Sequence, residues 1–221
     1  MLQFFAKYKF LAVVLFVLSA IIISTIYSIL KPKEVLKVYQ PAEVSSELVD
    51  STRQHIKKYH TIADFSLLNQ NGETVTQDNY KDKIYVADFF FTTCQTICPI
   101  MTGHMHQIQE ELKNDADIML LSHTVTPEID SVPQLKKYAV NKEVNDDKWN
   151  LVTGDKKQIY NLARKSYLVA KDNPQDAYEL IHTENFVLVD TKKRIRGFYD
   201  GTNPEDIQKL LRDISILKLE D

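Results

Sequence analysis

Lys83-Ile84-Tyr85-Val86-Ala87-Asp88-Phe89-Phe90-Phe91-Thr92-Thr93-Cys94-Gln95-Thr96-Ile97-Cys98-Pro99 is the segment from which the architecture of this 221-residue chain can be worked out. Its first nine residues form a nearly continuous β-branched and aromatic run, which fits a strand buried on both faces of a parallel sheet. A helical pattern follows Pro99. The only two cysteines of the chain, Cys94 and Cys98, therefore lie where a buried strand gives way to a helix.

Strand-like and helix-like segments alternate on both sides of this motif. An Asn71-Gly72 pair after residues 62–68 predicts a hairpin, and residues 185–190 and 195–199 predict a second one. Strands are also expected at 118–122 and 149–152, and helices at 99–112, 133–140, after Asp155 and at 205–216. This order predicts an α/β, thioredoxin-like fold with an N-terminal hairpin extension, with the cysteines at the sheet edge where α/β proteins place their sites.

An uncharged apolar run at residues 10–30 precedes this domain. It is long enough to span a bilayer and has no small-residue cleavage pattern, so an uncleaved transmembrane helix is favoured over a signal peptide. We expect a short tail at 1–9, the anchor at 10–30, a polar tether at 31–58 and the globular domain at 59–217. The absence of an Arg-rich presequence favours the bacterial cytoplasmic membrane, with the domain facing the periplasm or exterior.

The charged residues argue against one class of partner. The net charge is −3, from 27 basic and 30 acidic residues, and the paired lysines lie beside acids. Without a basic stripe on the chain, nucleic-acid binding is not expected.

Cys94 and Cys98 are four residues apart, so a helix would place them on one face with Cβ atoms about 5–6 Å apart. They could close a disulfide with some backbone adjustment, or remain inert thiols. A helix N-terminus favours thiolate, which is both a nucleophile and a ligand for soft ions such as Cu(I). Redox exchange and metal capture therefore both remain open.

A metal site would need a third donor. His182, just before the strand at 185–190, is favoured because the loop entering that strand lies against the dithiol helix in a thioredoxin-like fold. His123 is a weaker candidate at the end of another strand, and the other histidines are expected at the surface. Met101 and Met105 continue in a helical stripe and are expected in the core.

The chain resembles the Sco/SenC family, membrane-tethered copper proteins that assist cytochrome c oxidase assembly. The resemblance covers residues 60–216 and rests on motifs in order: His60-Thr61-Ile62-Ala63-Asp64-Phe65, Asn69-Gln70-Asn71-Gly72, the 89–99 motif, Ser122-His123-Thr124-Val125-Thr126-Pro127-Glu128-Ile129-Asp130-Ser131-Val132-Pro133, Trp149-Asn150-Leu151-Val152-Thr153-Gly154 and His182-Thr183. Three positions depart from the family pattern: Gln95 replaces a frequent proline, and Thr126 and Ile181 replace aspartates.

The resemblance implies copper bound by Cys94, Cys98 and His182, as Cu(I), with Cu(II) left open. It also implies delivery of copper to the dinuclear site of the cytochrome c oxidase copper-site subunit, reduction of that site's thiols, and contacts with other copper chaperones or thiol reductants. The alternative is an exported thiol-disulfide oxidoreductase of thioredoxin type. The nearest proline to the expected facing position is Pro174, which argues against a general reductase.

Overall fold

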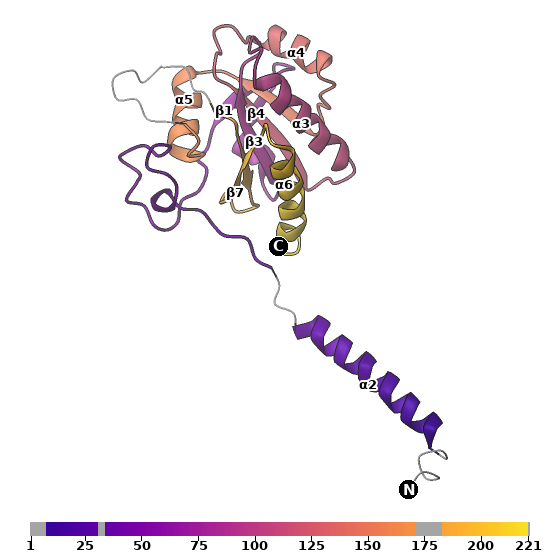
Figure 1. The fold of residues 1–221 in the computed structure, drawn as a ribbon. Coiled ribbons are helices and arrows are strands. Elements are labelled where there is room, and N and C mark those ends of the chain that lie inside the picture. Colours follow the sequence, from indigo (N-terminus) through magenta and orange to yellow (C-terminus); the bar gives the residue numbers. More distant parts are fainter. Residues whose placement is uncertain (1–7, 31–33, 171–182, 221) are drawn as a thin grey trace. The chain divides into compact units, whose positions relative to one another are not determined.

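The computed structural model describes residues 8–30, 34–170 and 183–220. The chain divides into two compact units, the first ending at Val35 and the second beginning at Leu36. Figure 1 colours both along the sequence, with the first unit in indigo.

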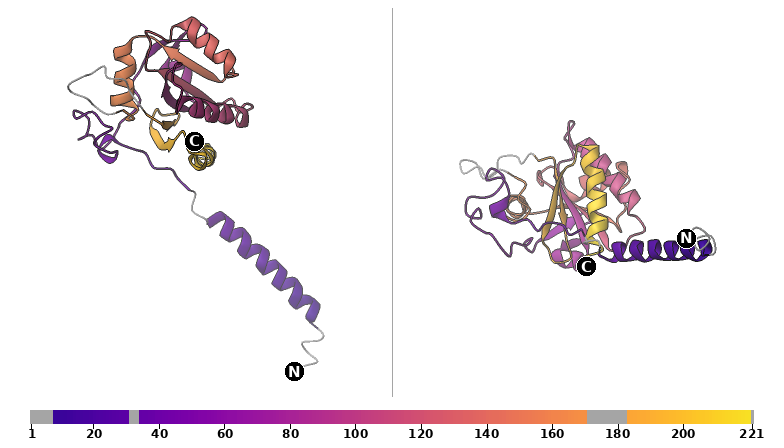
Figure 2. Two further views of the ribbon diagram at one scale, coloured as in Figure 1. Left: turned by 45° about the horizontal axis from the view of Figure 1, so that its top comes forward. Right: turned by 60° about the horizontal axis from the view of Figure 1, so that its bottom comes forward.

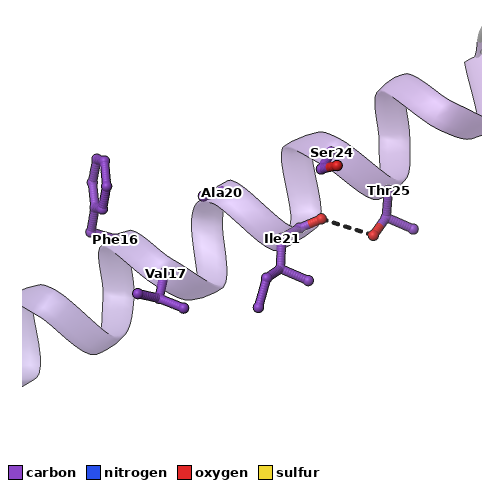
Figure 3. Close-up of a pocket in the computed structure, with 6 residues that line it drawn as sticks. All are labelled: Phe16, Val17, Ala20, Ile21, Ser24 and Thr25. Atoms are coloured by element: carbon purple, nitrogen blue, oxygen red, sulfur yellow. Dashed lines mark hydrogen bonds between the residues drawn. The ribbon is translucent and has the colours of Figure 1, made fainter.

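The first unit contains one long apolar helix, α2 (Lys9–Leu30), of 22 residues. At a rise of about 1.5 Å per residue it is long enough to cross the hydrocarbon core of a bilayer. Within the described residues, Lys9–Tyr27 is the one candidate span. Two of its hydroxyl groups bond carbonyls within the helix, each over 2.8 Å: Ser19 donates to the Phe16 carbonyl and Thr25 to the Ile21 carbonyl. Figure 3 shows the second of these bonds. The helix matches the predicted anchor at 10–30.

A seven-stranded sheet forms the centre of the second unit, in the order β2-β1-β5-β4-β3-β6-β7. The strands are β1 (Ser66–Asn69), β2 (Thr74–Thr76), β3 (Ile84–Phe90), β4 (Ile118–Thr124), β5 (Trp149–Thr153), β6 (Asn185–Val189) and β7 (Ile195–Asp200). Neighbours β3, β4 and β5 are parallel, and β6 and β7 add an antiparallel hairpin. β3 lies inside the sheet, between β4 and β6, and is buried along its whole length, as its apolar run predicts.

Helices cover both faces of this sheet (Figure 1). α3 (Cys98–Glu111), α4 (Val132–Asn141) and α6 (Pro204–Leu217) pack on one face, and Figure 2 shows α6 beside α3. α5 (Lys156–Asn161), extended by a π-helical turn at Leu162–Ser166, packs on the other. The side chains of Asp155 and Asn203 accept hydrogen bonds from amides in the first turns of α5 and α6 and so cap both helices.

The N-terminal hairpin is also present, with β1 and β2 antiparallel. Gly72 has φ +77° in its turn, a conformation that glycine adopts without strain. β1 is shorter than the apolar pattern at 62–68 suggests: Ile62 and Phe65 are buried but precede the strand. Two 3-10 turns, Pro41–Glu43 and Gln77–Tyr80, complete the described elements.

The structure differs from the sequence prediction over the expected tether at 31–58. From Leu36 onward these residues belong to the folded unit. The Tyr39 amide donates to the Ile195 carbonyl over 2.9 Å, its ring packs edge-on against Phe198, and Val49 is 1% exposed in the core. The polar composition of the segment concealed these contacts, so the folded unit begins well before residue 59.

Candidate metal and dithiol site

The two cysteines lie at the edge of the sheet where β3 ends. β3 stops at Phe90, a loop covers residues 91–97, and α3 begins at Cys98. Pro99 occupies the first turn of α3, where a missing amide hydrogen costs nothing. Ile97, the residue before the helix, has no side-chain cap. The first amides of α3 are therefore available to groups in the loop.

One of those amides bonds the first cysteine. The Cys98 N–H donates to Sγ of Cys94 over 3.5 Å, and Thr96 Oγ1 lies 3.6 Å from the same sulfur. Cys94 is partly exposed and Cys98 is buried, at 3% exposure. The pair is therefore asymmetric, with one accessible sulfur at a helix N-terminus and one sulfur inside the core.

The same contacts separate the acidities of the two thiols. Partial burial alone raises the pKa of Cys94, but hydrogen bonds from the Cys98 thiol and amide and from Thr96 outweigh it and lower the pKa to about 7. Burial raises the pKa of Cys98 to about 12, and the neighbouring Cys94 sulfur adds to the effect. Of the two thiols, Cys94 therefore ionises at the lower pH, and thiolate is the form that can attack as a nucleophile or bind a metal ion.

Both cysteines are free thiols in the structure. The disulfide predicted between Cys94 and Cys98 is not formed in this state. Closure remains a prediction for an oxidised form of the protein.

A buried carboxyl group lies in β3 on the approach to the motif. Asp88 is 2% exposed, and its Oδ1 has no hydrogen-bond partner among the described residues. Burial raises its pKa to about 7, against the opposing effect of a hydrogen bond from Ser122. Its charge adds to the factors that raise the pKa of Cys98. The sequence analysis missed Asp88, although an acid inside an apolar strand is a signal that could have found it.

A second acid, Asp130, joins the motif loop to the loop after β4. Its carboxylate accepts hydrogen bonds from the Thr92 amide and hydroxyl, at 3.2 and 2.5 Å, and from the Thr126 hydroxyl at 3.0 Å. The Thr124 hydroxyl donates to it as well. Asp130 is 0% exposed. Sequence reasoning assigned it no role, because the contacts join segments that are far apart in the chain.

The described histidines do not gather at the cysteines. His123 is fully buried against Phe89, with stacked rings 4.8 Å apart, on the opposite face of the sheet from Cys98. His60 bonds the Ser166 carbonyl at 2.8 Å and His104 the Gly201 carbonyl at 2.7 Å. The weaker expectation for His123 as a ligand is therefore wrong, because its ring is enclosed in an aromatic cluster.

The remaining predicted residues fall into three groups. His106 lies 3.8 Å from Glu143, and His55 is exposed. Met101 and Met105 are fully buried in the core, as predicted. His182, the favoured third ligand, lies outside the described residues. Among the residues that the structure does describe, no group of three or more metal-binding side chains is found.

The model of the protein family described as SCO1/SenC matches residues 53–217, about three quarters of the length of the chain. The chain belongs to the SCO1/SenC family. Among its curated relatives, the SCO1 protein homolog of Bacillus subtilis is 33% identical over 157 residues, which is 70% of this chain and 81% of the relative.

Solved structures of the SCO1/SenC family share the fold. BsSco, a member of the Sco family of cytochrome c oxidase assembly proteins in which a disulfide switch was identified, is 31% identical and has a TM-score of 0.61, covering 72% of this chain and 93% of its own. Arabidopsis thaliana ScoI, solved with copper bound, is 25% identical with a TM-score of 0.56, covering 69% of this chain and 97% of its own. The predicted α/β, thioredoxin-like fold is confirmed.

Proposed function

We propose that this SCO1/SenC protein binds copper through Cys94, Cys98 and His182 and delivers it to the dinuclear copper site of cytochrome c oxidase during assembly. The observation that carries the proposal is the asymmetric thiol pair at the start of α3, in a chain whose relatives include a Sco protein solved with copper bound. Delivery to the oxidase is proposed because BsSco is a member of a family of oxidase assembly proteins.

The described residues suit a soft metal ion. Two sulfur donors, one in the loop before α3 and one on its first residue, favour Cu(I). The pKa of about 7 makes Cys94 available as thiolate near neutral pH. Copper is the cargo here, and the protein's own part is to offer thiolates that can hold and release it. Cys98 must lose its proton to join, so metal capture by both sulfurs releases protons.

The position of β6 supports His182 as the third donor. β6 runs antiparallel to β3, with Ala87 opposite Val187, so its first residue, Asn185, lies toward the edge where β3 ends. The chain enters β6 through buried Thr183, whose hydroxyl accepts from the Asn185 amide at 3.2 Å. His182 directly precedes Thr183 in the sequence.

We further propose that α2 anchors the protein in the bacterial cytoplasmic membrane with the domain facing outward. The proposed partners of the exported domain are the copper-site subunit of cytochrome c oxidase and other copper chaperones or thiol reductants. The support is the length and apolar character of α2.

A second function, thiol-disulfide exchange, is favoured by the same pKa difference. An accessible thiolate beside a buried thiol is the arrangement with which dithiol proteins attack a disulfide and then resolve the intermediate. We propose it as the means by which the protein keeps client thiols reduced, or as the whole function if copper is not retained.

A competition titration of the full chain in detergent, under anaerobic conditions with a Cu(I) chelator, tests the first function. Replacing a residue that only hydrogen-bonds a metal ligand typically costs about 10–100-fold in affinity, so losing a ligand itself in His182→Ala or Cys98→Ser should cost at least about 100-fold. His55→Ala is the matched control, because His55 is exposed. Unchanged affinity in both ligand variants would refute the ligand set, and turnover on a thiol substrate without copper retention would favour the second function.

A further inference from the structure

We propose that Asp130 is a positioning residue for the cysteine pair, acting through its hydrogen bonds to Thr92. The Asp130–Thr92 contact fixes the start of the loop that carries Cys94 and thereby sets how readily the Cys94 and Cys98 sulfurs meet. The inference rests on the proposed function only in naming copper as the cargo of the pair.

Asp130 is built into the fold as an acceptor. A carboxylate offers about four acceptor sites, and the carboxylate accepts the Thr92 amide and hydroxyl and the hydroxyls of Thr124 and Thr126. These partners come from two segments, the motif loop and the end of β4. The Asp130 amide also donates to the Thr126 carbonyl at 2.8 Å, which holds its own backbone in place. Its burial means that water cannot replace a lost donor cheaply.

Thr92 is fixed from a second side. Its hydroxyl, after donating to Asp130, accepts from Gln134 Nε2 of α4 at 3.0 Å. Thr92, which lies two residues before Cys94 in the chain, is thus bonded both to the loop before α4 and to α4 itself. Just upstream, the Val125 amide donates to the Phe90 carbonyl at 2.9 Å and continues the pairing of β3 with β4.

The loop is therefore held at both ends. Asp130 holds its start at Thr92, and α3 holds its end at Cys98. Between them the Cys94 amide bonds the Phe91 carbonyl at 3.3 Å, and the Cys94 sulfur bonds the Cys98 amide at 3.5 Å. Freeing Thr92 would let the loop swing away from the helix N-terminus. The sulfurs would then spend less time within bonding reach of each other or of one metal ion.

The test compares the pairing equilibrium of the two cysteines in variants of the full chain, metal-free and in detergent. Protein dithiol and oxidised dithiothreitol exchange to protein disulfide and reduced dithiothreitol, so the equilibrium constant reports the effective concentration of one thiol at the other. Thr92→Val removes the hydroxyl at nearly constant shape, Thr92→Ser retains it, and Asp130→Asn removes part of the acceptor.

The chain provides a matched control in Thr52. Its amide and hydroxyl also both bond a buried aspartate, Asp50, in the N-terminal segment. Thr52→Val removes the same kind of hydrogen bond away from the motif loop. It therefore separates a general loss of stability from an effect on the cysteines.

We expect Thr92→Val and Asp130→Asn to lower the equilibrium constant about tenfold, the size of one hydrogen bond to a charged group. Thr92→Ser should stay within about twofold of the parent, since its hydroxyl still reaches the carboxylate. Thr52→Val should leave the equilibrium constant unchanged. Equal constants for Thr92→Val and Thr52→Val would overturn the proposal, as would failure of Thr92→Ser to restore the parent value.

The Cu(I) titration separates this inference from the proposed function. If the parent chain holds no Cu(I), the copper function fails while the exchange equilibrium still tests the Asp130–Thr92 contact. If the parent holds Cu(I) and Thr92→Val exchanges like Thr52→Val, the positioning role fails and the copper function stands.

Discussion

The amide of Cys98, the first residue of α3, donates a hydrogen bond over 3.5 Å to the sulfur of Cys94 in the preceding loop. The residue before the helix, Ile97, offers no side-chain cap. The Cys94 sulfur, four residues before Cys98, accepts from the first helical amide instead. The contact links the fold to the chemistry, because it both orients the Cys94 sulfur and favours its thiolate.

The first prediction concerns thiol reactivity. In the metal-free, reduced protein, alkylation of Cys94 by iodoacetamide should rise with pH to a half-maximal rate near pH 7, because its pKa is lowered to about 7. Cys98 should remain nearly unreactive at that pH, since burial raises its pKa to about 12. Peptide mapping by mass spectrometry assigns the rates. Equal rates with a shared midpoint near an ordinary thiol pKa would contradict the asymmetry.

A second prediction concerns Asp88. Its pKa is raised to about 7 in the folded state by burial, so the folded protein binds this proton more tightly than the unfolded chain does. The associated stability is complete below about pH 4 and is lost as the pH rises toward 7. Asp88→Asn should remove that slope and raise the free energy of unfolding at pH 8 by up to about 4 kcal/mol, at 1.36 kcal/mol per pKa unit.

Urea unfolding of a fragment beginning at Leu36, at pH 5 and pH 8, checks this. The parent should lose stability relative to Asp88→Asn between the two pH values. A constant difference between parent and variant would show that Asp88 titrates alike in the folded and unfolded chains.

The third prediction concerns His123, whose effect on stability changes with pH in the opposite direction to that of Asp88. Burial lowers its pKa to about 3, so the folded state favours the neutral ring. The stability from this preference is present above the unfolded pKa of about 6.5 and is lost as the pH falls toward 3. His123→Phe keeps the stacked aromatic contact with Phe89 and should flatten this acid limb in the same assay. If His123→Phe loses as much stability at low pH as the parent does, groups other than His123 cause that loss.

A fourth prediction concerns Arg196, which joins the N-terminal segment to the domain. Arg196 is 3% exposed and donates to the carbonyls of Leu36 and Lys37, and its guanidinium pairs with buried Asp190 and with Glu220. Arg196→Met leaves buried charge uncompensated and should cost about 3–5 kcal/mol. It should also free the segment for trypsin cleavage at Lys37.

Arg194→Ala is the matched control, because Arg194 pairs with the same Asp190 but is about one third exposed. Its loss should cost about 1 kcal/mol, as expected of a more solvated pair. Urea unfolding and limited proteolysis distinguish the two. Similar losses in both variants would show that the Leu36 and Lys37 contacts contribute little.

The sequence predicted the elements of the domain well, because local patterns carry that information. The apolar run before Cys94 forms the buried strand β3, and Asn71-Gly72 lies in a hairpin turn. The prediction failed where contacts between distant parts of the chain determine the structure. The segment from Leu36 to Lys58 looks like a tether in composition, yet Tyr39 and Val49 pack on the domain.

The candidate site, too, was predicted only where local sequence patterns mark it. The spacing of Cys94 and Cys98 identified the dithiol, and the asymmetry of the pair follows from burial, which the spacing alone does not reveal. The contact between Asp130 and Thr92 joins residues 38 positions apart in the chain, so no local pattern marks it. His182 remains a prediction from its position before β6 and from the family resemblance.

X-ray absorption at the copper edge, on the anaerobically loaded full chain and on His182→Ala, tests the central claim most directly. The account predicts sulfur scattering from Cys94 and Cys98 together with imidazole scattering in the parent. It predicts retained sulfur and lost imidazole scattering in His182→Ala, with His55→Ala identical to the parent. Imidazole scattering that persists in His182→Ala, or a parent chain that holds no copper, would contradict it.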